Sequence, residues 1–181
     1  MSINVVGVEI VTVRLPSTLV ADMDRWIAQS EDFTNRPDFI ITALREYTLG
    51  LDIIYNLKSL EELKRLKIEG FEETIDEFGL EFRDLFRDEL TTRIEQMKKD
   101  KEKYHSFKGE PTRVVMRMPL GLRKRWEKIK SLNVPVKNYQ DLIRFSIYPF
   151  AERHGYTNAG ADPIEILKLL KDEINSLDEK K

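Results

Sequence analysis

Residues 11–16 read Val-Thr-Val-Arg-Leu-Pro, and residues 114–119 read Val-Val-Met-Arg-Met-Pro. These two stretches open segments that align without a gap at an offset of 103 residues. Identical residues recur further along, in the pairs Leu19 and Leu122, Asn35 and Asn138, and Asp38 and Asp141. Because the apolar register also holds over about 35 residues, we predict that the chain carries one small structural unit twice.

Each unit is expected to open with a short strand whose side chains alternate between a core and an outward face. The expected inward residues are Val11, Val13 and Leu15 in the first strand and Val114, Met116 and Met118 in the second. The expected outward residues are Ile10, Thr12 and Arg14 in the first and Arg113, Val115 and Arg117 in the second. Proline then ends each strand, because it has no N–H for the ladder and suits a helix start.

Two helices are predicted to follow each strand. The first helix of each unit has one apolar stripe, formed by Leu19, Met23, Trp26 and Ile27 or by Leu122, Trp126 and Ile129. The second begins at an asparagine N-cap, Asn35 or Asn138, and has an acid three residues later. It is expected to bury Phe39, Ile40, Ala43, Leu44 and Tyr47, or Leu142, Ile143, Ile147 and Phe150. A single strand with two helices leaves unpaired edges and a small core, so each strand needs a partner strand.

This order of elements, with its Arg-Leu-Pro or Arg-Met-Pro strand exit, resembles the ribbon-helix-helix superfamily of MetJ/Arc/CopG-like DNA-binding proteins. The resemblance covers residues 8–48 and 111–151. It implies a mainly α fold with two ribbon-helix-helix repeats. We expect residues 49–107 to form a helical connecting and oligomerisation segment. Residues 162–178, which open with Asp-Pro, are expected to form a C-terminal helix.

The resemblance also implies a DNA site. In that family two antiparallel strands lie in the major groove, and their outward side chains meet base edges. The implied base readers are Thr12, Arg14, Arg113, Val115 and Arg117, with Ile10 on the same face. Arginine can bridge guanine O6 and N7, and threonine can hydrogen-bond or touch a thymine methyl. The chain departs from the family pattern at Ile10 and Val115, which are apolar, and at Pro37, which removes one N–H from the start of a helix.

Phosphate contacts are expected at the start of the second helix of each unit and from basic side chains nearby. The residues in this set are Asn35, Arg36, Lys137, Asn138, Tyr139, Arg123 and Lys124. The whole chain has a net charge of −2, but residues 108–154 hold 11 basic and 4 acidic side chains, a net of +7. Residues 1–48 hold 4 and 7, a net of −3. The second unit should therefore dominate phosphate contact, unless its positive surface complements the acidic middle segment instead.

The middle segment reads as helical because it lacks proline and is too apolar for disorder. Ser59 with Glu62 matches a capping box and predicts a helix start, while Gly70 and Gly79 are expected to interrupt the segment. A heptad-like apolar seam is formed by Phe71, Ile75, Phe78, Phe82 and Leu85. This seam is expected to pack on its own chain or on a second chain, and a ligand pocket between its phenylalanines is a further alternative.

Several functional classes lack their residues in this sequence. The chain has no cysteine and two histidines, His105 and His154, and it contains no Gly-rich phosphate loop or nucleophile elbow. We therefore expect no cofactor, no metal and no enzymatic activity. No apolar run is long enough to span a membrane and the start is not a signal peptide, so a cytoplasmic protein is expected.

Two pairings of the strands are open from sequence. Both strands can pair within one chain, giving a pseudo-symmetric ribbon for an asymmetric site, or each can pair with its twin in a second chain. Unequal charge favours the first, and a homodimer through the helices is expected in addition. The predicted function is a sequence-specific DNA-binding transcriptional regulator that represses by covering a promoter. The alternatives are an antitoxin-like protein that holds a partner through its middle helices, or an assembly protein.

Overall fold

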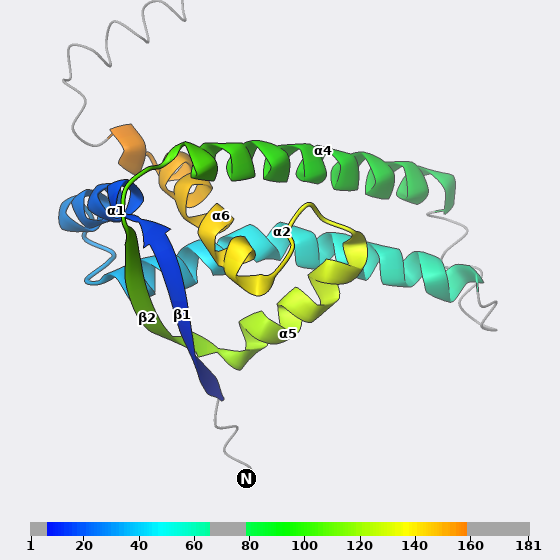
Figure 1. The fold of residues 1–181 in the computed structure, drawn as a ribbon. Helices are drawn as coiled ribbons and strands as arrows, with labels where there is room; N and C mark the ends of the chain where they lie inside the picture. Colours follow the sequence, from blue (N-terminus) through cyan, green and yellow to red (C-terminus); the bar gives the residue numbers. More distant parts are fainter. Residues whose placement is uncertain (1–6, 66–78, 159–181) are drawn as a thin grey trace, which may run out of the picture.

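The computed structural model describes residues 7–65 and 79–158. This part of the chain is mainly helical, as predicted, and contains a two-stranded antiparallel sheet (Figure 1). Strand β1 spans Val8–Pro16 and strand β2 spans Pro111–Pro119. Both strands belong to the same chain, so the intrachain pairing favoured by the charge distribution is the one observed.

Helices follow each strand in the same order. After β1 come α1 (Ser17–Gln29) and α2 (Arg36–Arg65). After β2 come α5 (Leu120–Ile129), a 3-10 turn (Lys130–Leu132) and α6 (Tyr139–Arg153), with a further 3-10 turn at Tyr156–Asn158. Helix α4 (Gly79–Ser106) lies between the two groups in the sequence and leads into β2.

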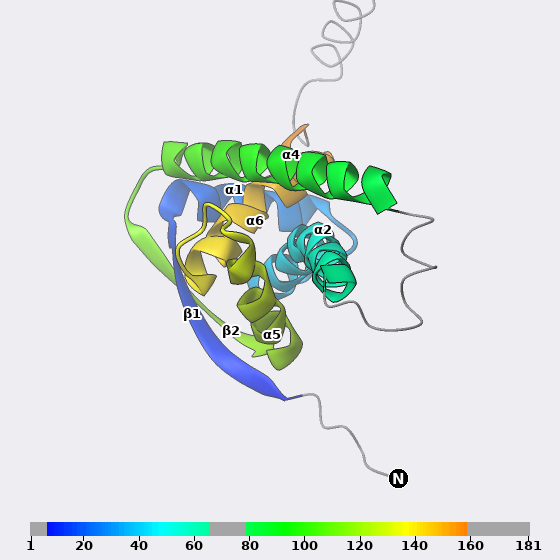
Figure 2. The ribbon, with the colours of Figure 1, turned by 90° about the vertical axis from the view of Figure 1, so that its right-hand side faces the viewer.

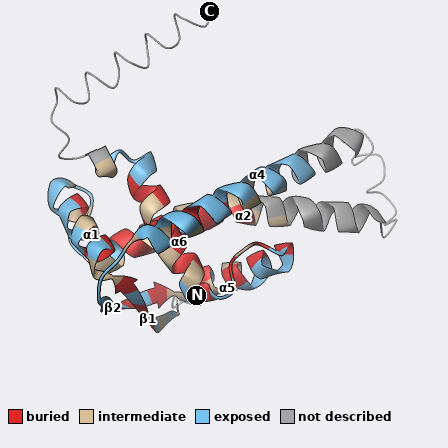
Figure 3. Ribbon diagram, turned by 45° about the horizontal axis from the view of Figure 1, so that its top comes forward, coloured by how far each residue is buried: buried red, intermediate tan, exposed pale blue. Residues whose placement is uncertain are grey.

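The strands and α4 lie on opposite sides of the molecule. Helices α2 and α6 occupy the middle, β1 and β2 run along one side, and α4 crosses on the other side in both views (Figures 1 and 2). Helix α4 packs on α6 and α2, and its outer side carries mostly exposed residues (Figure 3). The outward face of the ribbon is therefore free of cover by the helices of the described chain.

The core forms where the inward sides of the strands meet the helices. Every strand residue predicted to face inward is buried, and Val13, Leu15 and Met118 have no exposed surface. The predicted helix stripes are buried too, apart from a partly exposed Ile27. Rings of α1, α2 and α6 and the adjoining loops pack edge to face and stacked around Phe39. The alternation of the strands and the helical period were thus enough to predict the core.

Both predicted asparagine caps are present. The side-chain oxygen of Asn35 accepts from the backbone N–H of Asp38, and that of Asn138 accepts from Asp141, each at 2.9 Å. The N-termini of α1 and α5 are capped differently, by a backbone carbonyl of the residue that precedes the opposite strand. The N–H of Ser17 donates to the carbonyl of Glu110 at 3.1 Å, and the N–H of Leu120 donates to that of Gly7 at 2.9 Å.

A buried polar pair joins α2 to α4. The hydroxyl of Tyr47 donates to a carboxylate oxygen of Asp100 at 2.8 Å, and the amide of Gln96 donates to the other oxygen at 2.8 Å. Burial raises the pKa of Asp100, while these two hydrogen bonds lower it. The carboxyl group is satisfied although it is almost fully enclosed.

One prediction about the middle segment needs correction. The predicted helix start at Ser59 is wrong, since that residue lies inside α2, which runs from Arg36 to Arg65. Helix α2 also crosses the expected limit between residues 48 and 49, so the first unit and the middle segment share one continuous helix. No proline interrupts residues 38–65, and Gly50 is tolerated, so nothing local stops the helix. Helix α4 does begin at Gly79. The predictions for Phe71, Ile75, Phe78 and residues 162–178 lie outside the described residues, as do the side chains of Phe82 and Leu85.

Candidate nucleic-acid interface

The outward face of the ribbon carries the six side chains predicted from the alternation. The register places Ile10 opposite Arg117, Thr12 opposite Val115, and Arg14 opposite Arg113. Five of the six are exposed, and Thr12 is half-buried. Ile10 is 76% exposed and Val115 is 49% exposed, which is high for branched apolar side chains on a strand. The ribbon therefore presents cationic and apolar groups together on one accessible surface.

The three arginines of this face have no partner in the part of the chain that the structure describes. Within residues 7–65 and 79–158, the guanidinium groups of Arg14, Arg113 and Arg117 make no hydrogen bond or ion pair. Arg14 and Arg113 are also directly opposite each other, and like charges at that position destabilise a strand pair. No contact among the described residues offsets this repulsion, so the guanidinium groups remain available to hydrogen-bond acceptors that carry negative charge.

At one edge of the ribbon, the start of α2 is occupied by its own contacts. Arg36 forms a two-point ion pair with Asp24 of α1, with Nε–Oδ1 and Nη2–Oδ2 distances of 2.6 and 2.7 Å. The hydrogen bonds lower the pKa of Asp24 and raise that of Arg36. Pro37 contributes no N–H, and the oxygen of Asn35 is used in the cap.

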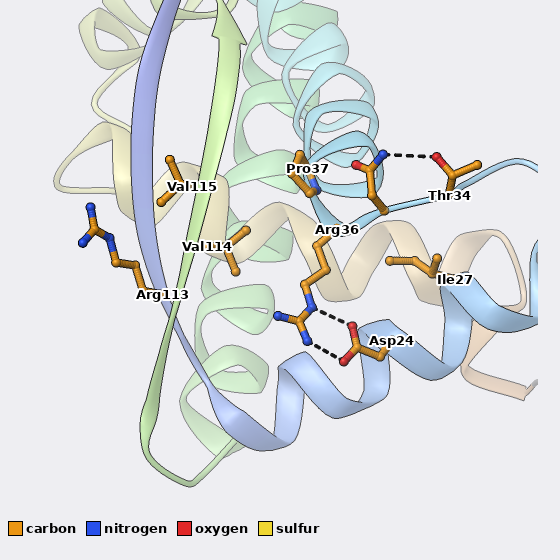
Figure 4. A pocket seen from close by; sticks show the side chains of 9 residues that line it. Asp24, Ile27, Thr34, Arg36, Pro37, Arg113, Val114 and Val115 are labelled. Atoms are coloured by element: carbon orange, nitrogen blue, oxygen red, sulfur yellow. Dashed lines mark hydrogen bonds and ion pairs between the residues drawn. The ribbon is translucent and has the colours of Figure 1, made fainter.

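An open hollow of ≈ 460 Å³ lies between this helix start and β2 (Figure 4). Its lining residues are Asp24, Ile27, Thr34, Asn35, Arg36, Pro37, Arg113, Val114 and Val115. In Figure 4 Arg36 turns toward Asp24, while Arg113 points away from that pair on the other side of the ribbon. The predicted base reader and the predicted phosphate contact thus flank one hollow without touching each other.

At the other edge, α6 holds the backbone of β1. The amide of Gln140 donates to the carbonyl of Thr12 at 3.3 Å, and Nε of Arg144 donates to the carbonyl of Arg14 at 3.2 Å. Asn138 uses its oxygen in the cap of α6, and Lys137 stands exposed just before it. Sequence reasoning missed Gln140 and Arg144, although both follow the predicted cap within two turns of a helix expected to lie beside a strand.

Among the other predicted phosphate contacts, two are engaged within the fold. The guanidinium of Arg123 lies 4.3 Å from the ring centroid of Tyr139, and its Nε is 3.1 Å from Oε1 of Glu9. The Tyr139 side chain is buried and its hydroxyl has no hydrogen-bond partner in the described chain. Burial, with a smaller contribution from Glu9, raises the pKa of Tyr139 to about 12. Lys124 and Lys137 are exposed and unpaired among the described residues.

Part of the positive charge of residues 108–154 serves the fold. Arg125 and Lys128 of α5 lie 3.7 and 4.0 Å from the carboxylate of Asp52 on α2. Arg125 also donates to the hydroxyl of Thr48 at 3.1 Å. A basic segment and an acid of the middle segment therefore do pair, and among the described residues this pairing involves α5 and not the ribbon.

The described residues contain neither a metal-binding cluster nor a membrane-spanning helix. No group of three or more His, Asp or Glu side chains there could hold a metal ion. None of the described helices combines the length and the apolar character needed to cross a membrane.

Within the described residues, the outward arginines of the ribbon make no contact with the rest of the fold, whereas several polar side chains of its two flanks are engaged in it. Comparison of the chain with models of protein families, with curated proteins and with solved structures finds no significant match.

Proposed function

We propose that this protein binds specific sequences in double-stranded DNA by inserting the β1–β2 ribbon into the major groove, and that it represses transcription by covering a promoter. The single observation that carries the proposal is the ribbon face, where Arg14, Arg113 and Arg117 have no partner within residues 7–65 and 79–158 and lie beside exposed Ile10 and Val115. Guanine offers two acceptors to an arginine, and thymine offers a methyl group to an apolar side chain. One two-stranded ribbon is also of a size that the major groove admits.

The proposal includes the finer fold, in which β1–α1–α2 and β2–α5–α6 are two ribbon-helix-helix repeats. The proposal is supported by two equivalent hydrogen bonds, from Ser17 to Glu110 and from Leu120 to Gly7. The two donors are 103 residues apart in the sequence, and so are the two acceptors. The same offset relates the two asparagine caps. The centre of the ribbon also obeys it, since Thr12 is paired with its own counterpart Val115.

Phosphate contacts in this proposal come from the second unit. Lys137 and Lys124 are exposed and have no partner among the described residues, whereas Arg36 on the opposite flank forms an ion pair with Asp24. Such contacts position the protein and make binding depend on salt, but they carry little sequence information.

The test is selection of bound sequences from random duplex DNA, followed by titration of the enriched sequence and a scrambled one at two salt concentrations. Arg117→Ala should weaken binding to the enriched sequence by about 1–3 kcal/mol and leave the scrambled sequence nearly unaffected. Lys137→Ala should weaken both sequences alike and reduce the salt dependence.

A matched control is Arg87→Ala, which removes the same charge from an exposed position of α4 on the far side of the molecule. It should change neither affinity nor specificity. Absence of any enriched sequence would contradict the proposal. An equal loss on both sequences for Arg117→Ala would remove base reading by that residue.

A further inference from the structure

The two ends of the ribbon face differ in chemistry. At one end Arg14 lies opposite Arg113, so two unpaired guanidinium groups are adjacent. At the other end Arg117 lies opposite Ile10, so one cation is adjacent to an apolar side chain that is 76% exposed. The middle pair, Thr12 and Val115, carries no charge.

The repeat offset shows which of these differences break the symmetry of the ribbon. Arg14 and Arg117 are counterparts at an offset of 103, and both are arginine. Ile10 and Arg113 are also counterparts, but one is apolar and the other cationic. Rotation about the centre of the ribbon therefore exchanges an arginine with an arginine at one outer position, an isoleucine with an arginine at the other, and Thr12 with Val115 in the uncharged middle.

Each difference has a distinct preference among base edges in the major groove. Arginine favours guanine through O6 and N7, and an apolar side chain favours the methyl group of thymine. An isoleucine has no donor for a guanine, so the end with Ile10 cannot satisfy the acceptors that Arg113 satisfies at the other end.

We propose that the ribbon reads a non-palindromic DNA site in one orientation. Arg14 and Arg117 each contact a guanine, one in each half of the site. At the second position the halves differ, because Arg113 contacts a guanine and Ile10 contacts a thymine. This inference rests on the proposed function. It adds the position at which the two half-sites differ and the residue pair that sets the difference.

The contacts between the ribbon and the helices also differ between the β1 edge and the β2 edge. The backbone of β1 is held by Gln140 and Arg144 of α6. On the β2 side, the start of α2 has Pro37, and Arg36 is turned to Asp24. Because both strands belong to one chain, the two ends keep these identities in every molecule.

The experiment compares the sites selected by three proteins, namely the wild type, Ile10→Arg and Arg113→Ile. The wild type should select a non-palindromic site. Ile10→Arg should select a site with the second guanine in both outer halves, and Arg113→Ile should select one with the thymine in both outer halves, while the central base pairs under Thr12 and Val115 need not be symmetric. Each variant should prefer its own site to the wild-type site by about 5- to 150-fold, the range that one base contact supplies.

Both substitutions fall on exposed positions of the ribbon, and circular dichroism with thermal unfolding checks that each variant folds like the wild type. A palindromic site for the wild type would overturn the inference and leave the proposed function intact. So would a non-palindromic wild-type site that Ile10→Arg and Arg113→Ile both leave unchanged. Failure of all three proteins to enrich any sequence would overturn the proposed function and the inference with it.

Discussion

The ion pair with Asp24 limits the availability of Arg36 for other anions. The two side chains form an exposed ion pair between α1 and the start of α2, at the edge of the hollow beside the ribbon. An exposed pair of this kind contributes little to stability, typically about 0–1 kcal/mol. Its larger effect is to keep a guanidinium away from any anion that approaches this flank.

Asp24→Asn should therefore increase DNA binding while costing less than about 1 kcal/mol in the free energy of unfolding. With Arg36 released, affinity for all sequences should rise at low salt, and the slope of log affinity against log salt should steepen by up to about one unit. The measurement is a salt titration of binding to a scrambled duplex. Asp22→Asn is the matched control, because Asp22 pairs with Arg25 on the same helix. An equal steepening in both variants would mean that net charge, and not Arg36, is responsible.

In contrast to the exposed pair of Asp24 and Arg36, the hydrogen-bonded pair of Tyr47 and Asp100 is buried. Because burial raises the pKa of Asp100, the folded protein binds this proton more tightly than the unfolded chain does, and ionisation costs stability as pH rises through the folded pKa. The hydrogen bond from Tyr47 offsets part of that cost by stabilising the charged form.

Tyr47→Phe should lower the free energy of unfolding by about 1–3 kcal/mol at pH 7, because a buried carboxylate loses one of its two donors. The loss should shrink as the pH is lowered through the raised pKa of Asp100, because the protonated carboxyl group depends less on the missing donor. Urea unfolding at several pH values measures both effects. Tyr148→Phe removes a hydroxyl from a half-buried tyrosine that makes ring contacts with Trp26 and Phe107, and it should change stability less at every pH. A pH-independent loss for Tyr47→Phe would show that Asp100 is not the group involved.

At the scale of elements, the connection from α4 to β2 fits closely against the start of α1. Gly109 has a φ of 101°, and a Cβ there would collide with the hydroxyl of Ser17. Lys108 exchanges hydrogen bonds with Thr18 beside it, so the segment cannot move away without losing these contacts.

Gly109→Ala should therefore destabilise the protein by about 1–3 kcal/mol, through strain at positive φ and through the collision with Ser17. Gly121→Ala offers the opposite case, because Gly121 lies in α5 and a Cβ there meets no atom within 4 Å. It should be neutral or stabilise the protein by up to about 1 kcal/mol. Thermal unfolding of both variants tests the pair, and equal shifts would refute this account of the connection.

Much of the element structure was predictable because it depends on local patterns. Strand alternation, the prolines and the two asparagine caps are written within a few residues, and each was confirmed in place. The boundary of α2 was not, because a Ser-x-x-Glu pattern looks the same inside a helix as at its start. The pairing of Arg36 with Asp24 and of Arg123 with Glu9 depends on how distant segments pack, which local patterns do not contain.

At the scale of the whole molecule, the ribbon is complete in a single chain. Its strands are separated by the long α2 and α4, yet they pair in a continuous register from Val8 to Pro16. The homodimer expected from the helical seam stays a prediction, and the ribbon does not depend on it.

One chain should accordingly suffice for one DNA site. Titration of a single selected site with protein, at a DNA concentration far below the dissociation constant, should give a simple hyperbolic curve at the lowest concentrations that bind. A ribbon shared between chains would come apart on dilution and give a steeper curve. Sedimentation of the free protein and of the complex gives the stoichiometry independently. Two chains on one minimal site from a protein that sediments as a monomer when free would contradict the expectation.

A ribbon made from two separately encoded strands also changes how inherited variation acts on it. In a symmetric homodimer, one codon change alters both strands together, so every variant stays two-fold symmetric. Here a codon change in β1 leaves β2 as it was, because the two strands are different parts of one gene product. Selection can therefore adjust one end of the ribbon while the other end stays fixed.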